Sequence, residues 1–168
     1  MESVDVSTPG IRYQRILFCT DFSPNADYAF HYALVAAQRS GGAELHILHV
    51  LPEPEAQFWK TYLYEVDDVE ARASADMNRK ISECYLRSIA PPVVAVVTIY
   101  QGKAEEEILR FAVRIEADLI VLGRQGSRSP GIHLFGKVTE VIARKAPCPV
   151  LIIPHAREGV PPGKKSGR

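Results

Sequence analysis

Short apolar runs alternate with segments of helical periodicity along most of this chain. The runs are rich in strand-forming residues and lack strict alternation, which is typical of strands covered on both faces. Strands are expected over residues 15–20, 44–51, 93–100, 118–122 and 150–153. Strands that alternate with helices form parallel sheets with right-handed crossovers. The sequence therefore predicts one α/β domain, a three-layer sandwich with a five-stranded parallel sheet between helices.

The segments between these strands carry helix signals. In the first, Ser23 is suited to the N-cap and Pro24 to the first turn, and Gly41-Gly42 ends the helix. Its core face is expected at Ala26, Phe30, Ala33 and Ala37. Further helices are expected over about residues 67–89, after Gly102, and from Val138 to about residue 146. The helix after Gly102 is expected to bury Ala104, Ile108, Ala112 and Ile115.

Charge and cysteine content narrow the class of protein. Lys plus Arg number 20 and Asp plus Glu number 20, so no global field attracts nucleic acid or an anionic membrane. Cys19, Cys84 and Cys148 are widely spaced and form no CxxC, which argues against disulfides and zinc. The first residues lack the pattern of a signal peptide, and no apolar run approaches the roughly 20 residues that span a bilayer. We expect a cytoplasmic protein with no nucleic-acid or membrane partner.

The expected domain covers residues 13–155. Residues 1–12 are predicted to form a flexible tail, and residues 156–168, which are rich in Pro, Gly and Lys, a disordered one. Residues 52–66 form a long irregular connection that carries several aromatic side chains. We expect these aromatics to cover a core edge or contact a second subunit rather than stack on a ligand.

Two predicted strands end in residues suited to a ligand. Cys19, Thr20 and Asp21 end the first strand, and Leu122 and Gly123 end the fourth. In open parallel sheets, ligands bind at the carboxyl ends of strands where the strand order reverses. We expect the strand order 3-2-1-4-5, in which the first and fourth strands are neighbours at the switch point and both ends open into one crevice. Asp21 could instead cap the following helix, but Ser23 is better placed for that bond, which leaves Asp21 for a ligand.

A glycine-punctuated loop runs from Gly123 to Lys137. Glycines permit positive φ and let backbone N–H groups approach phosphate oxygens. Gly136 lies at the start of the last helix, where the N-terminus favours an anion. The loop also carries the cations Arg124, Arg128 and Lys137. From these residues alone two interpretations stay open: a phosphate-binding loop, or a flexible loop with ordinary turn glycines.

Other sites are not supported by the residue pattern. Gly131 to Lys137 resembles the front of a Walker A loop, but Val138 stands where Ser or Thr would bind Mg²⁺. His46 and His49 lie three apart on a strand and point to opposite faces, so they cannot share a metal. No residues have the spacing of a catalytic triad or of a general base with a metal. We expect no catalytic residue and no resident metal.

Three features occur together in an order typical of one family. Gly123, Gly126 and Gly136 match the pattern G-x2-G-x9-G-(S/T), in which Lys137 replaces the final Ser or Thr. The first strand ends in an acidic residue, and the last strand follows Ala146-Pro147-Cys148-Pro149. From about Arg15 to Pro154 the chain resembles the universal stress protein family, whose nucleotide-binding branch carries this pattern.

The resemblance implies a Rossmann-like fold of the adenine-nucleotide alpha hydrolase type, and ATP as ligand, with ADP or AMP as alternatives and Mg²⁺ accompanying ATP. Asp21 would contact the ribose or adenine side, Val50 would offer backbone groups to adenine, and the glycines would cradle phosphates and ribose. The binding residues it implies are Cys19, Thr20, Asp21, Val50, Leu122, Gly123, Gly126, Arg128, Gly136, Lys137 and Val138.

The resemblance also implies an assembly and two alternative functions. The predicted strand Val150–Ile153 is apolar and uncharged, and an edge of that kind pairs readily with another chain. A homodimer through this strand, antiparallel across a two-fold axis, is expected. The protein would be a nucleotide-binding stress-response module with at most very slow ATP hydrolysis, or a member that binds no nucleotide and acts through protein contacts. Lys137 separates the two, because its ammonium can pair with phosphate or its bulk can displace one.

Overall fold

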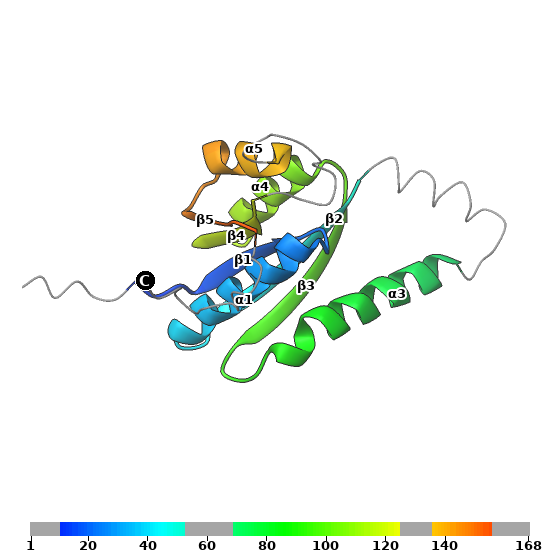
Figure 1. Cartoon of the computed structure of the whole chain (residues 1–168), viewed down its shortest axis with the longest axis horizontal. Coiled ribbons are helices and arrows are strands. Elements are labelled where there is room, and N and C mark those ends of the chain that lie inside the picture. Colours follow the sequence, from blue (N-terminus) through cyan, green and yellow to red (C-terminus); the bar gives the residue numbers. More distant parts are fainter. Residues whose placement is uncertain (1–10, 53–68, 125–135, 156–168) are drawn as a thin grey trace, which may run out of the picture.

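The computed structural model of the chain describes residues 11–52, 69–124 and 136–155, with side chains from residue 75 onward in the second of these ranges. Most of both predicted tails and nearly all of the 52–66 segment lie outside these residues. Within them the elements follow the predicted alternation (Figure 1). In chain order they are β1 (Arg15–Thr20), α1 (Pro24–Arg39), β2 (Glu44–Leu51), α3 (Val69–Cys84), η1 (Leu86–Ser88), β3 (Val94–Gln101), α4 (Ala104–Arg114), β4 (Leu119–Gly123), α5 (Lys137–Lys145) and β5 (Val150–Ile153).

The sheet has the order β3-β2-β1-β4-β5, and every neighbouring pair is parallel. Figure 1 shows α4 and α5 on one side of it and α1 and α3 on the other. This confirms the predicted three-layer architecture and strand order. Within the described residues, the helix predicted over 67–89 is divided into α3 and the short η1.

Side chains along the central strands alternate between two cores. Ile16 and Phe18 of β1 pack beneath α1 and α3, whereas Leu17 and Cys19 pack beneath α4 and α5. Both faces of the central strands are therefore covered by helices, which explains why the sequences of these strands are continuously apolar. The edge strand β3 is less covered, and Val94 is 60% exposed. Each fully buried aliphatic or aromatic side chain contributes about 1.5–3 kcal/mol of transfer free energy.

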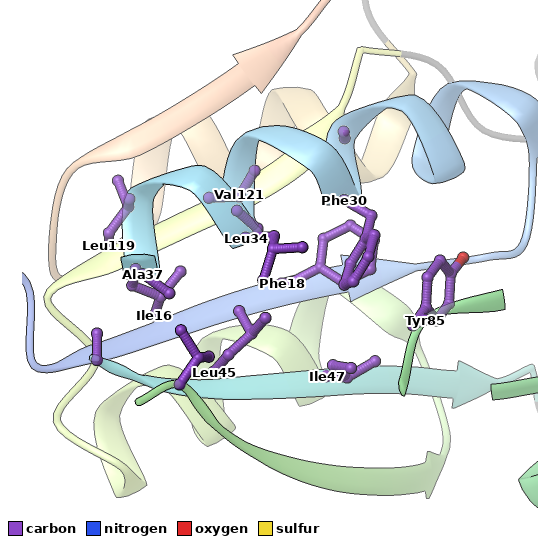
Figure 2. Packing of buried hydrophobic residues seen from close by; sticks show 14 of the residues in the cluster. Ile16, Phe18, Phe30, Leu34, Ala37, Leu45, Ile47, Tyr85, Leu119 and Val121 are labelled. Atoms are coloured by element: carbon purple, nitrogen blue, oxygen red, sulfur yellow. The ribbon is translucent and has the colours of Figure 1, made fainter. Parts of the chain in front are cut away.

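Three aromatic rings pack together in the core between α1, α3 and the sheet. Phe18 lies 5.5 Å from Phe30 and 5.4 Å from Tyr85 between ring centroids, and Figure 2 shows the three rings grouped at the carboxyl end of β1. The predicted core face of α1 is confirmed by the burial of Ala26, Phe30, Ala33 and Ala37. In α4, Ile108 and Ala112 are buried, and Ala104 and Ile115 pack partly buried against the other core. The helix faces thus follow from the spacing of apolar residues.

The start and end of α1 are set by the predicted residues. Ser23 Oγ accepts a hydrogen bond from the N–H of Ala26 at 3.2 Å, which is the expected N-cap. After α1, Gly41 and Gly42 have φ of +83° and +99°, a region that disfavours residues with a Cβ. A Cβ on Gly42 would lie 2.7 Å from the carbonyl oxygen of Pro92, whereas one on Gly41 would meet nothing within 4 Å. The tight turn before β2 therefore favours glycine at both positions because of the positive φ, and at position 42 also because of the close approach of Pro92.

These two glycines offer a matched pair of substitutions. We expect Gly41→Ala to lower the free energy of unfolding by about 1–2 kcal/mol, the cost of positive φ for an L-residue. Gly42→Ala should lose about 1–3 kcal/mol more, since Pro92 must move to admit the new methyl group. Urea titrations of both variants measure the difference. Equal losses would show that the contact with Pro92 does not constrain the turn.

Candidate functional site

The strand order reverses between β1 and β4, and these strands separate at their carboxyl ends. Their pairing extends to Phe18 opposite Val121, whereas β1 continues to pair with β2 as far as Thr20 opposite His49. β4 continues beside β5 as far as Gly123 opposite Ile153. The two halves of the sheet therefore diverge at the switch point, between the predicted ligand residues at the ends of β1 and β4.

A strained turn joins β1 to α1. Phe22 has φ of +58°, an uncommon conformation for a residue with a bulky side chain. The N–H of Phe22 donates to Thr20 Oγ1 at 2.9 Å, and the N–H of Ser23 donates to Asp21 Oδ1 at 3.0 Å. Asp21 is exposed, but its carboxylate also supports the turn. Ser23 is the N-cap, as predicted, and Asp21 binds a different N–H group of the same turn.

Thr20 lies at the centre of a polar network that includes the buried Tyr85 and His49 and the exposed Asp27. Its hydroxyl lies 2.6 Å from the hydroxyl of Tyr85, which donates to Asp27 Oδ1 at 2.6 Å. Its carbonyl oxygen accepts a hydrogen bond from Nδ1 of His49 at 2.8 Å. Both polar groups of Thr20 are thus used inside the protein. Thr20 belongs to the site by position, and its side chain holds the strand end.

His49 is packed tightly beside this turn. The centroid of its ring lies 4.7 Å from the centroid of the Phe22 ring. Lys80, on α3, places its Nζ 4.4 Å from the same Phe22 centroid. Burial lowers the pKa of His49, an effect opposed by the Thr20 carbonyl and Asp21 and reinforced by Lys80. His46 points to the opposite face of the sheet from His49, as predicted. There its ring contacts Phe111. In the ranges that the structure describes, no group of three or more metal-ligating residues converges.

Gly123, at the end of β4, is required by packing. A Cβ there would lie 2.9 Å from Cγ of Asn25. The Asn25 amide donates to the carbonyls of Ile153 and Pro154 at 3.2 and 3.1 Å, which joins the start of α1 to the end of β5. Thr139 Oγ1 donates to the Gly123 carbonyl at 3.0 Å. The glycine lets α1, β4 and α5 meet at one point.

Gly136 is the N-cap residue of α5 and has an ordinary φ of −66°. Its N–H donates to the Arg124 carbonyl at 2.9 Å, and the N–H of Arg124 donates to the Ile153 carbonyl at 2.7 Å. The Gly136 N–H is therefore committed internally. An anion at this end of α5 would instead face the N–H groups of the first turn, which have no carbonyl acceptor within the helix.

Lys137 extends toward α4. Its Nζ lies 3.5 Å from Glu105 Oε1, with the lysine side chain 84% exposed and the glutamate 17% exposed. The ammonium end of this pair is open to solvent whereas the glutamate is largely buried, so the lysine is the partner that can move away. Val138 packs partly buried against the core beneath α4 and α5, which gives its side chain a structural role.

The remaining predicted site residues divide into two groups. Cys19, Val50 and Leu122 are buried at strand ends, so only their backbones can face a ligand. Burial raises the pKa of the Cys19 thiol, and the nearby Cys148 raises it further, which keeps Cys19 a neutral, unreactive core residue. Gly126 and Arg128 lie outside the residues that the structure describes.

Four residues of this region were not predicted from the sequence: Tyr85, Asp27, Asn25 and His49. No local pattern connects Tyr85 with Thr20, which lie 65 residues apart in the chain. Asn25 shows only as a polar residue in a first helical turn, although it is buried. A buried polar residue in a first turn is a weak indication of a tertiary contact.

Comparison with known proteins identifies the family to which these features correspond. The model of the Universal stress protein family matches residues 12–154. A universal stress protein of Thermus aquaticus is 31% identical over 147 residues, covering 84% of this chain and 98% of the relative. The solved structure of universal stress protein UspA from Lactobacillus plantarum is 32% identical, with a TM-score of 0.67, covering 85% of this chain and 99% of that one.

Two further solved structures share the fold and hold nucleotides. A universal stress protein in complex with cAMP has a TM-score of 0.57 and 24% identity, covering 87% of this chain and 100% of that chain. An Arabidopsis thaliana protein of the family with AMP bound has a TM-score of 0.52 and 18% identity, covering 89% and 97%. At these identities the likeness establishes the fold.

The lowered pKa of His49 gives a pH prediction. As the pH is lowered, the unfolded chain takes up a proton on His49 near the ordinary histidine pKa of about 6.5, whereas the folded chain does so only at a lower pH. The contribution of His49 to stability is therefore lost as the pH falls through this range. His49→Asn keeps an N–H donor near the position of Nδ1 and does not titrate. We expect it to lose less thermal stability than the wild type between about pH 7.5 and about pH 5.5.

The control is His31→Asn, which changes an exposed histidine of α1. This variant should follow the wild type at both pH values. If His49→Asn also follows the wild type, proton uptake by His49 is not linked to unfolding.

Proposed function

Because the chain belongs to the universal stress protein family, we propose that it binds an adenine nucleotide at the carboxyl ends of β1 and β4. The ligand we propose is ATP with Mg²⁺, and ADP or AMP would use the same contacts. The observation that carries the proposal is the spacing of Gly123, Gly126 and Gly136, which joins the end of β4 to the N-cap of α5. The nucleotides held by two structural relatives support it.

In this proposal the phosphates lie at the first turn of α5, where N–H groups and the helix dipole favour negative charge. Asp21 accepts a hydrogen bond from the ribose, and the backbone at Val50 faces the adenine. Lys137 exchanges Glu105 for a phosphate, which the exposure of the lysine side chain allows. The protein holds its nucleotide with at most very slow hydrolysis, as a homodimeric module of the stress response in the cytoplasm.

A second candidate function rests on Lys137. This residue replaces the Ser or Thr of the nucleotide-binding pattern. If its side chain displaces the phosphate, the protein binds no nucleotide and acts through protein contacts. The two functions differ in one measurable property, the affinity of the wild-type chain for ATP and AMP.

Substitutions of Asp21 test the proposed site. Asp21→Asn retains an oxygen that can accept from the Ser23 N–H but removes the charge, whereas Asp21→Ala removes both. We expect both variants to bind Mg-ATP and AMP about tenfold or more weakly in calorimetry, a loss of about 1.4 kcal/mol. Only Asp21→Ala should also lose measurable stability.

The matched controls are Asp76→Asn and Asp76→Ala, which remove the same charge from the exposed surface of α3. They should bind like the wild type. If Asp21→Asn binds nucleotide with wild-type affinity, the charge of the Asp21 carboxylate does not contribute to ligand binding. Absence of binding to the wild-type chain would favour the protein-contact function.

The proposed homodimer is testable at the sheet edge. β5 pairs with β4 at one edge, and Leu151 is 37% exposed there, which leaves an apolar strand open to a second chain. Leu151→Lys should yield a monomer in light scattering, because the lysine would place charge in the interface. Val94→Lys at the opposite edge strand β3 should leave the dimer intact. A dimer that survives Leu151→Lys and dissociates in Val94→Lys would place the interface at β3.

A further inference from the structure

We propose that Tyr85, which directly follows α3, is a positioning residue for the nucleotide site: its hydroxyl holds the turn that presents Asp21 to the ligand. Tyr85 lies outside the glycine pattern and 64 positions beyond Asp21 in the chain. The proposal rests on the proposed function, since it assigns to Tyr85 an effect on nucleotide affinity. It extends the site from the two strand ends to a helix on one face of the sheet.

The hydrogen bonds run in one direction. A carboxylate accepts only, so the single Tyr85 proton goes to Asp27 Oδ1 at 2.6 Å. The Thr20 hydroxyl, 2.6 Å from the Tyr85 oxygen, must then donate to it. The Thr20 oxygen in turn accepts the Phe22 N–H at 2.9 Å. Each donor in this chain has its acceptor, so removing the Tyr85 hydroxyl takes the acceptor from the buried Thr20 hydroxyl proton and one donor from the exposed Asp27 carboxylate.

Tyr85 is held rigidly enough to act as an anchor. Its side chain is 1% exposed, and its ring lies 4.8 Å from Phe30 and 5.9 Å, stacked, from Phe22 between centroids. Figure 2 shows the Tyr85 oxygen beside the tip of β1. Burial, followed by the hydrogen bond to Asp27, raises the pKa of Tyr85, so the phenol stays a neutral donor. The hydroxyl therefore occupies one fixed place relative to the core.

The anchored turn sets the direction of Asp21. Asp21 lies between Thr20, whose oxygen holds the Phe22 N–H, and Phe22, whose φ is +58°. The Asp21 carboxylate is itself bonded to the Ser23 N–H within this turn. If the Thr20 side chain loses its anchor, the strained backbone at Phe22 can relax and Asp21 moves with it. Affinity should then fall through Asp21, although Tyr85 touches no ligand.

The test is a double-mutant cycle with nucleotide affinity and stability as separate readouts. Tyr85→Phe keeps the ring and its packing and removes only the hydroxyl. We expect it to weaken binding of Mg-ATP and AMP several-fold in calorimetry and to lower the unfolding midpoint in urea. In the Asp21→Ala background, Tyr85→Phe should lower the midpoint again but leave the affinity unchanged, because the group that it positions is absent.

Two further substitutions complete the design. Tyr32→Phe removes a phenol hydroxyl from the Tyr28–Tyr32 pair on α1, and it should leave nucleotide affinity at the wild-type value. Thr20→Val removes the hydroxyl that bonds both Tyr85 and the Phe22 N–H, with little change in shape. It should lose at least as much affinity as Tyr85→Phe, and it replaces that variant in the cycle if Tyr85→Phe does not fold.

The outcomes separate this inference from the proposed function. If the wild type binds nucleotide and Tyr85→Phe binds equally well while less stable, Tyr85 is structural only and the inference is overturned. Fully additive affinity losses from Tyr85→Phe and Asp21→Ala would also overturn it. If the wild-type chain binds neither ATP nor AMP, the proposed function fails and the positioning role fails with it.

Discussion

Phe22 adopts a backbone conformation that is unfavourable for a large side chain, and the candidate site depends on the bonds that hold it there. Thr20 and Asp21 each bind an N–H of the turn, and the buried Tyr85 and His49 bind Thr20. The strain is located where β1 leaves the sheet beside its switch point. A strained turn persists only where its surroundings over-determine it, and such turns cluster at functional sites.

The general architecture could be predicted from the sequence because it depends on patterns that are local in the chain. Apolar runs, helical spacing and the residues at Ser23 and Gly41-Gly42 indicated the elements, and their alternation indicated the parallel sheet. The glycine spacing located the loop between β4 and α5. The strand order came from the family resemblance and the switch-point rule, and the structure confirms it.

The structural reasons behind individual site residues could not be predicted, because they depend on contacts between distant segments. Gly123 has no side chain partly because Asn25 occupies that space, and Asn25 is there to bind the end of β5. Gly136 uses its N–H on Arg124 rather than leaving it for an anion. Lys137 faces Glu105 of α4. Composition and spacing carry no information on these pairings, and each one changes the role that a motif residue can have.

The central claim is that this chain holds an adenine nucleotide at the divergence of β1 and β4. The most direct measurement is to denature the purified protein and to identify the released small molecules by mass spectrometry, with calorimetry of the emptied protein against Mg-ATP. The account predicts adenine nucleotide in equimolar amount with the chain, or saturable binding of added Mg-ATP. No released nucleotide together with no calorimetric response would contradict it and would leave the glycine loop without a ligand.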